Sequence, residues 1–235
     1  MQTPLSLFIS GAMQKSSRYL YRDFFELELS QSSKHMMDAF VSKAYARTEE
    51  ALINELRKHP KSGAVGEGEP TKGKINFTVS SIDGIKNLTR ALPFFSTSVC
   101  AYYVGEDGVS VPQCCVIDFP ALGEICYVEK GKSALLIKNA SANSSIKLKP
   151  SVHTNPHLAL VSEEFSSSFA CEKRNLGCFS YELILLASGK ADIIVSDEGG
   201  KHFKLISELL SEETGCKILS TSPMVISNGH CKLEL

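Results

Sequence analysis

The sequence contains no tryptophan, and no apolar run in it approaches the length of a membrane helix. Such a helix needs about 20 predominantly apolar residues, so we do not expect a membrane-spanning protein. An excess of charge is also missing, because 25 Lys and Arg residues face 26 Asp and Glu residues. Direct binding to nucleic acid usually needs a strongly basic surface and is therefore not expected. The first residues lack the basic segment and cleavage site of a signal peptide, which predicts a cytoplasmic location.

The composition is that of a globular protein, with 43% hydrophobic and 22% charged residues in a chain of 235. The eight cysteines form no C-x-x-C pair, and their spacing does not suggest a zinc finger. Several of them lie within apolar runs, such as residues 98–104 and 112–118. We predict buried and unreactive thiols, with disulfides or a redox role as the alternative.

Hydrophobic periodicity divides the chain into a helical start, a series of strands and an alternating end. Apolar spacing predicts helices over residues 6–29 and 39–58, followed by an exposed loop over 59–74. The strands predicted next are 75–83, 94–104, 109–119, 124–138 and 144–149. Beyond them come strands at 157–163, 191–196, 217–219 and 223–228, with helices at 177–189 and 204–215. This order predicts a single α/β or α+β domain over 1–235, with lobes of about 1–150 and 151–235.

The stretch FTVSSIDGIKNLTRALPFF, residues 77–95, resembles the signature W-x-x-D-P-(I/L)-D-G-T-x-N-F of the inositol monophosphatase superfamily. Residues 38–52, 66–67, 116–134 and 174–192 are similar to four further landmarks of that family, in the same order. The resemblance implies a layered αβαβα sandwich of the inositol monophosphatase and sugar phosphatase type. It also implies Mg²⁺-dependent hydrolysis of phosphomonoesters and, commonly, a homodimer.

Part of the family's site is retained in this sequence. The resemblance places Glu67, Asp83 and the Ile82 carbonyl at metal-ligand positions, and the backbone at Gly84 and Ile85 at the phosphate. Paired Mg²⁺ ions polarise a phosphate and activate a water, and Mg²⁺ prefers carboxylate oxygens as ligands. Magnesium is therefore the cofactor that the resemblance implies.

Other positions depart from the family's pattern. Ser80 stands where the family has an aspartate that bridges both metals, and Ile85 replaces a threonine that positions the water. Tyr45 falls on that threonine's acidic partner, and Lys204 falls on an aspartate that binds the second metal. We therefore expect two-metal binding to be weak or lost. We also expect the Lys204 ammonium to pair with Asp83, Glu67 or both, a solvated lysine being the alternative.

These departures favour a catalytically impaired relative that acts as a binding or assembly module. An active phosphatase with a rewired metal site, for inositol or sugar phosphates, is the alternative, and a sensor of phosphorylated ligands is a third. The expected partners are a second copy, a phosphorylated small molecule or another protein. The segment Lys130–Lys149 holds five lysines and no acid, which predicts solvated strand faces or, alternatively, a surface for an anionic partner.

Overall fold

The computed structural model describes residues 2–29, 34–138, 145–162, 171–197 and 200–231. The first half of the chain contains α1 (Pro4–Leu29), α2 (Lys34–Leu56), β1 (Ser62–Val65), β2 (Ile75–Asp83), α3 (Ile85–Thr89), β3 (Ser96–Val104), β4 (Ser110–Phe119), β5 (Glu124–Glu129), β6 (Leu135–Lys138) and β7 (Ser145–Lys147). The second half contains β8 (Leu158–Val161), β9 (Glu172–Arg174), α4 (Phe179–Ala187), β10 (Ile193–Ser196), α5 (Lys201–Thr214), β11 (Lys217–Thr221) and β12 (Met224–Ser227).

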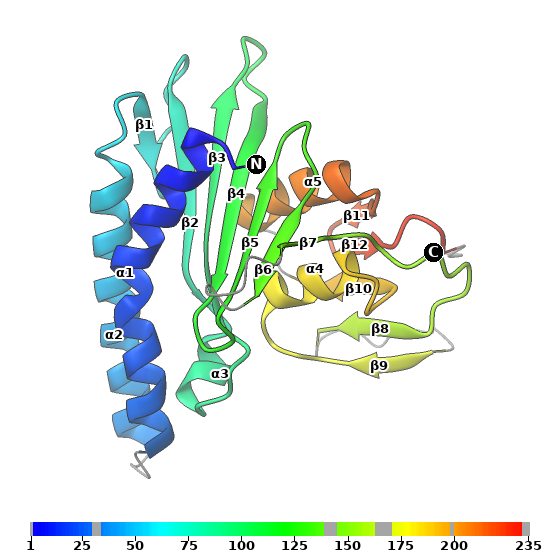
Figure 1. Cartoon of the computed structure of the whole chain (residues 1–235), viewed down its shortest axis with the longest axis horizontal. Helices are drawn as coiled ribbons and strands as arrows, with labels where there is room; N and C mark the ends of the chain where they lie inside the picture. Colours follow the sequence, from blue (N-terminus) through cyan, green and yellow to red (C-terminus); the bar gives the residue numbers. More distant parts are fainter. Residues whose placement is uncertain (1, 30–33, 139–144, 163–170, 198–199, 232–235) are drawn as a thin grey trace.

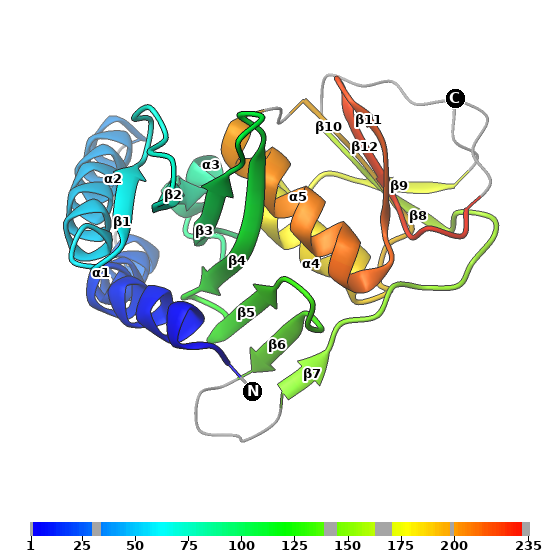
Figure 2. The same ribbon diagram turned by 90° about the horizontal axis from the view of Figure 1, so that it is seen from above.

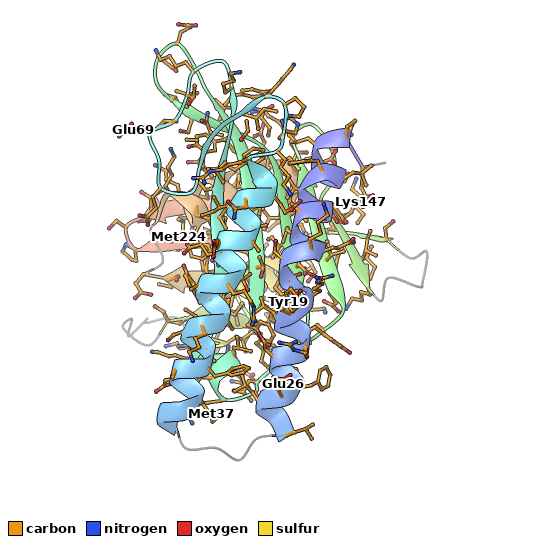
Figure 3. All side chains as sticks on the ribbon, turned by 90° about the vertical axis from the view of Figure 1, so that its left-hand side faces the viewer. Tyr19, Glu26, Met37, Glu69, Lys147 and Met224 are labelled. Carbon is orange, nitrogen blue, oxygen red and sulfur yellow. The ribbon has the colours of Figure 1, made fainter. Side chains whose placement is uncertain are left out.

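The first sheet follows the chain from β1 to β7 without a crossover. Only β1 and β2 run parallel; the other neighbours in this sheet pair antiparallel, and Gly105 and Gly108 close the turn between β3 and β4. Helices α1 and α2 lie side by side over one face of this sheet (Figures 1 and 3). Ile9, Met13 and Leu52 from the helices pack there against Phe77 and Val99 from the strands. Burial of these alternating apolar side chains holds the helical pair on the sheet.

The second sheet has the order β11-β12-β10-β8-β9, in which β8 runs parallel to both β9 and β10. Helices α4 and α5 lie between the two sheets, and a single apolar core joins them to both (Figure 2). The predicted layered α/β fold is thus confirmed. The described residues supply the layers helix, sheet, helix and sheet; the outermost helical layer of the expected αβαβα order is not among them.

Several element boundaries differ from the sequence prediction. Strands β1 and β9 and the short helix α3 were not predicted, and α5 begins at Lys201 rather than at 204. Of the five lysines in Lys130–Lys149, three form ion pairs: Lys130 with Glu212, Lys132 with Glu129 and Lys138 with Glu124. This pairing supports solvated strand faces over a surface for an anionic partner.

All eight cysteines are free, as predicted. Six of them are buried, while Cys171 and Cys231 are partly exposed. Burial raises the pKa of every one of these thiols, which disfavours the reactive thiolate. A search of the described helices found none that is both long and apolar enough to cross a bilayer. The cytoplasmic location stays a prediction.

Candidate functional site

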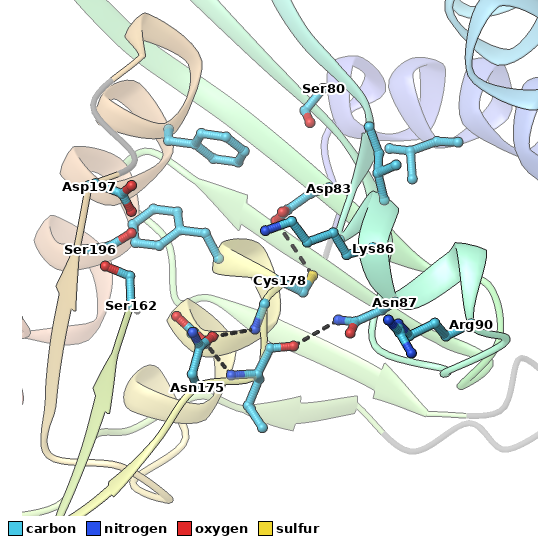
Figure 4. Close-up of a pocket in the computed structure, with 18 residues that line it drawn as sticks. Ser80, Asp83, Lys86, Asn87, Arg90, Ser162, Asn175, Cys178, Ser196 and Asp197 are labelled. Carbon is cyan, nitrogen blue, oxygen red and sulfur yellow. Dashed lines mark hydrogen bonds between the residues drawn. The ribbon is translucent and has the colours of Figure 1, made fainter. Parts of the chain in front are cut away.

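A pocket of about 670 Å³ opens where the two sheets meet (Figure 4). Its walls come from the end of β2, from α3, from the first turns of α4 and α5, and from the carboxyl ends of β8 and β10. Because β8 and β10 are parallel, they bring Ser162 and Ser196 to the same edge of the second sheet. Ligands of α/β proteins commonly bind at such an edge.

The chain turns sharply into the pocket where β2 ends. Gly84 has a φ of 81°, in the left-handed region, and a Cβ built there would lie 2.5 Å from the Phe94 carbonyl oxygen. The next turn, α3, is fixed by Asn87, whose Nδ2 donates to the carbonyl oxygens of Phe94 and Leu176 at 2.7 Å each. Only glycine fits this position without strain, so Gly84 sets the direction of α3.

Asp83 is a buried acid of the pocket, with 9% of its surface exposed. Its Oδ2 accepts the Ser180 backbone N–H at 2.7 Å and the Cys178 thiol at 3.5 Å. Burial raises the pKa of the Asp83 carboxyl, and the bonds from Ser180 and Cys178 oppose that shift. The carboxylate thus serves as the cap of α4, since the first backbone N–H groups of a helix need an acceptor.

Five of the residues singled out from the sequence meet in this pocket. Its lining includes Ser80, Ile82, Asp83, Gly84 and Ile85. Ile85 is 44% exposed, so an aliphatic side chain stands at the entrance where the resemblance would place a threonine. The end of β2 and the turn after it thus place these five residues at one cavity.

Glu67 and Tyr45 lie apart from the pocket lining. Glu67 is exposed in the loop after β1, and Tyr45 is half-buried on α2, packed against an apolar cluster. Burial, together with the negative charges of Glu49 and Glu67, raises the pKa of the Tyr45 hydroxyl. The two residues are thus near each other, but neither contributes to the cavity wall.

The expected ion pair of Lys204 is wrong. Lys204 is exposed, and no carboxylate oxygen of the described residues lies within 4.0 Å of its ammonium. Because α5 begins at Lys201, the Lys204 side chain points out of the pocket and Phe203 lines it instead. Phe203 meets Phe179 edge to face, with 5.3 Å between the ring centroids. The helix thereby places an uncharged phenyl ring at the pocket wall.

Sequence reasoning missed much of the pocket's polar wall. Lys86, Asn175 and Cys178 line it, as do the acids Glu182 and Asp197. Glu182 is buried and accepts the Leu176 backbone N–H at 3.0 Å, while Asp197 is exposed at the end of β10. Lys86 lies inside the signature and could have been noticed there. Asn175 and Cys178 come from the segment between β9 and α4, Glu182 comes from α4, and Asp197 follows β10.

The donor set of the pocket does not fit a pair of Mg²⁺ ions. No three His, Cys, Asp or Glu side chains of the described ranges are placed to hold a metal ion. Asp83 accepts the Ser180 N–H at the start of α4, Glu182 accepts the Leu176 N–H from the loop before that helix, and Ser80 offers only a neutral hydroxyl. Mg²⁺ requires near-octahedral oxygen coordination, mainly from carboxylates, phosphate and water.

Comparison with known proteins gives one consistent picture, although no family model matches the chain. It is 26% identical over 227 residues to an inositol-1-monophosphatase of Caulobacter vibrioides, with 88% of this chain and 86% of the relative covered. An inositol-1-monophosphatase of Mesorhizobium japonicum is 28% identical over 209 residues, with 80% and 74% covered.

Solved structures agree in fold. The extragenic suppressor protein suhB of Bartonella henselae superposes with a TM-score of 0.76 at 20% identity, over 98% of this chain and 95% of that one. A staphylococcal IMPase-II superposes with a TM-score of 0.74 at 15% identity, over 97% and 90%. The fold is therefore shared along nearly the whole chain.

Proposed function

Because the chain belongs to the inositol monophosphatase superfamily, we propose that it is a catalytically impaired member that keeps the fold as a binding or assembly module. The observation that carries this proposal is the donor set of the pocket. Ser80 offers a hydroxyl, Phe203 a phenyl ring, and Asp83 a carboxylate already bound to the start of α4. Of these three groups only Asp83 supplies a carboxylate, and one of its two oxygens already accepts a backbone N–H.

The chemistry makes this loss severe. Hydrolysis of phosphate monoesters is among the slowest uncatalysed reactions in water, so an enzyme must supply nearly its whole apparatus. Paired metal ions carry most of that task, since they activate the water and stabilise both the attacking and the leaving oxygen. Even a residue that only orients a metal ligand typically contributes about 10–100-fold to affinity or activity. Loss of the ligands themselves is expected to cost more.

The test combines metal binding with hydrolysis on the purified chain. We expect Mg²⁺ titration by calorimetry to give no saturable signal at millimolar concentrations. We also expect no turnover of myo-inositol 1-phosphate or of a generic phosphomonoester above the buffer rate. Saturable Mg²⁺ binding together with turnover would overturn the proposal.

An active Mg²⁺-dependent phosphomonoesterase with a rewired site is the second candidate. Two observations favour it: Asp83, Glu182 and Asp197 all line the same pocket, and the relatives named above are inositol-1-monophosphatases. In such an enzyme Asp197 would take over a ligand role from a lost carboxylate. The variant Asp197→Asn separates the candidates, because it would abolish turnover in the second and leave no activity to lose in the first.

The partner of an assembly module is also part of the proposal. We propose a homodimer, as the family resemblance implies, and light scattering on the purified chain gives its mass directly. A mass near 25.6 kDa, that of one chain, at micromolar concentration would count against the dimer.

A further inference from the structure

The pocket is electrically divided between two facing walls. Lys86 and Arg90 lie on the α3 side, whereas Asp197, Ser196 and Ser162 lie on the opposite side, at the ends of β10 and β8 (Figure 4). Lys86 extends from α3 into the cavity in that view. A ligand in this pocket would thus meet positive charge on one side, and a carboxylate with hydroxyls on the other.

The positive wall rests on a rigid base. Lys86 lies on α3 and Arg90 is the C-cap residue of that helix, and both belong to the face of this turn that lines the pocket. That face is fixed because Leu88, on the other side, is fully buried, and because Asn87 ties α3 to the carbonyls of Phe94 and Leu176. A fixed backbone reduces the entropy that two long side chains lose when they hold a ligand together.

The positive charges of this wall are not neutralised by ion pairs among the described residues. Neither Lys86 nor Arg90 has a carboxylate oxygen within 4.0 Å in the part of the chain that the structure describes. The buried acids nearby are already satisfied, since Asp83 accepts from Ser180 and Glu182 accepts from Leu176. Two cations on a cavity wall with no internal partner favour an anion from outside.

We infer that Lys86, together with Arg90, anchors the phosphate group of a phosphorylated polyol in this pocket without a metal ion. This inference rests on the proposed function, since it gives the non-catalytic pocket its ligand. The Lys86 ammonium is a point charge, and the Arg90 guanidinium offers the planar, bidentate geometry that matches phosphate oxygens. Hydroxyl groups of the ligand's body donate to Asp197 and exchange hydrogen bonds with Ser162 on the facing wall.

The test measures binding in the absence of any metal. The full-length chain, kept in EDTA, is titrated by calorimetry with inorganic phosphate, with myo-inositol 1-phosphate and with uncharged myo-inositol. We expect saturable binding of both anions, tighter binding of the ester, and none of inositol alone. Binding of inorganic phosphate with the same affinity as the ester would overturn the role given to Asp197 and Ser162.

Variants locate the anchor. A charge-assisted hydrogen bond to phosphate is expected to change affinity by about tenfold or more, so Lys86→Met should weaken ester binding by that factor. Lys43→Met removes another exposed lysine, on α2 and outside the pocket lining, and should leave affinity unchanged. Lys86→Arg keeps the charge and should retain most of the affinity, which excludes a folding defect as the cause. Equal losses in the Met variants of Lys86 and Lys43 would refute the anchor.

The same protein preparation distinguishes failure of the phosphate anchor from failure of the proposed function. If Mg²⁺-dependent turnover appears, the proposed function fails whatever the EDTA titration gives. If turnover is absent and the EDTA titration shows no saturable binding, only the anchoring by Lys86 and Arg90 fails. The expected result is binding without turnover.

Discussion

Asp83 offers the sharpest distinction between a catalytic carboxylate and a structural one. In this chain its Oδ2 holds the Ser180 backbone N–H at 2.7 Å, at the start of the nine-residue helix α4. We therefore predict that Asp83→Ala destabilises the fold, because it leaves that buried N–H without an acceptor. A metal ligand behaves differently, since its removal relieves the repulsion of a metal-free site and leaves the fold intact or more stable.

The expected size of the effect follows from the contacts of Asp83. An unsatisfied buried donor costs about 1–3 kcal/mol, and loss of a helix cap costs about 0.5–2 kcal/mol, with both figures describing the same bond. A protein of this length changes its melting temperature by about 2–4 °C for each kcal/mol. Taking about 2 kcal/mol, we expect Asp83→Ala to lose that much free energy of unfolding and to melt roughly 4–8 °C below the wild type. Asp83→Asn keeps an acceptor oxygen for Ser180 and loses only the charge, so we expect a shift of at most about 2 °C.

Urea denaturation at pH 7, followed by circular dichroism, measures both variants against the wild type. The m-value should stay constant, which assigns the change to the native state. The reasoning about Asp83 is refuted if Asp83→Ala is as stable as the wild type or more stable. It is also refuted if the Asn and Ala variants lose equal stability, since the charge rather than the accepted hydrogen bond would then matter.

Three further predictions concern the surroundings of the pocket. In the same urea assay, Gly84→Ala should lose about 1–3 kcal/mol of stability because of its left-handed backbone, and more because its Cβ would clash with the Phe94 oxygen. Gly73 is also left-handed but has open space around it, so Gly73→Ala should lose only the stability that the backbone conformation costs. His202 bonds Ser98 and Thr78, and burial lowers its pKa to about 3. Since the unfolded chain binds that proton near pH 6.5, stability should fall as the pH drops from about 6.5 towards 3, and less so in His202→Gln. Finally, Mg²⁺ binding measured by calorimetry should appear in Ser80→Asp combined with Phe203→Asp, and not in Ser80→Asp combined with Lys204→Asp.

The elements that the sequence predicted well are those with a strong periodic pattern. Helices α1, α2 and α4 and strands β2 to β5 all bury one apolar face or both, and their residues show it. The elements that were missed carry no such pattern. Strand β9 consists of three exposed charged residues, β1 is only partly buried, and α3 is too short for a helical repeat. Backbone pairing with a neighbour, rather than side-chain burial, decides their conformation.

The residues of the pocket also divide into those that a sequence pattern could place and those that it could not. Ser80, Ile82, Asp83, Gly84 and Ile85 are adjacent in the sequence, so a motif could place them together. The residues of the facing wall, at the ends of β8 and β10, are separated from that motif by nearly eighty residues or more. Their position depends on the parallel pairing of two short strands in another sheet, which no local pattern in the chain encodes.

The start of α5 shows how a small error changes a chemical argument. The N-cap of the helix is Gly200, which offers no side-chain cap, so the usual polar signal for a helix start is missing and the predicted start falls three residues late. Each residue of a helix turns its side chain by about 100°, so the neighbours Phe203 and Lys204 face different surroundings. The charge argument based on Lys204 therefore fails, because that ammonium lies outside the pocket.

Weak metal binding stays a prediction, and its physical basis changes. A phenyl ring on α5 contributes no ligand, and the cation that would repel dications comes from the opposite wall, through Lys86. A pocket that carries its own ammonium and guanidinium already has positive charge where a phosphate would bind. Added Mg²⁺ would have to enter against these cations, so their removal by Lys86→Met should favour the metal and disfavour the anion. If Lys86→Met binds Mg²⁺ more tightly and phosphate more weakly, the Lys86 ammonium has replaced the metals as the phosphate ligand. If neither affinity changes, the site has only lost its metal ligands.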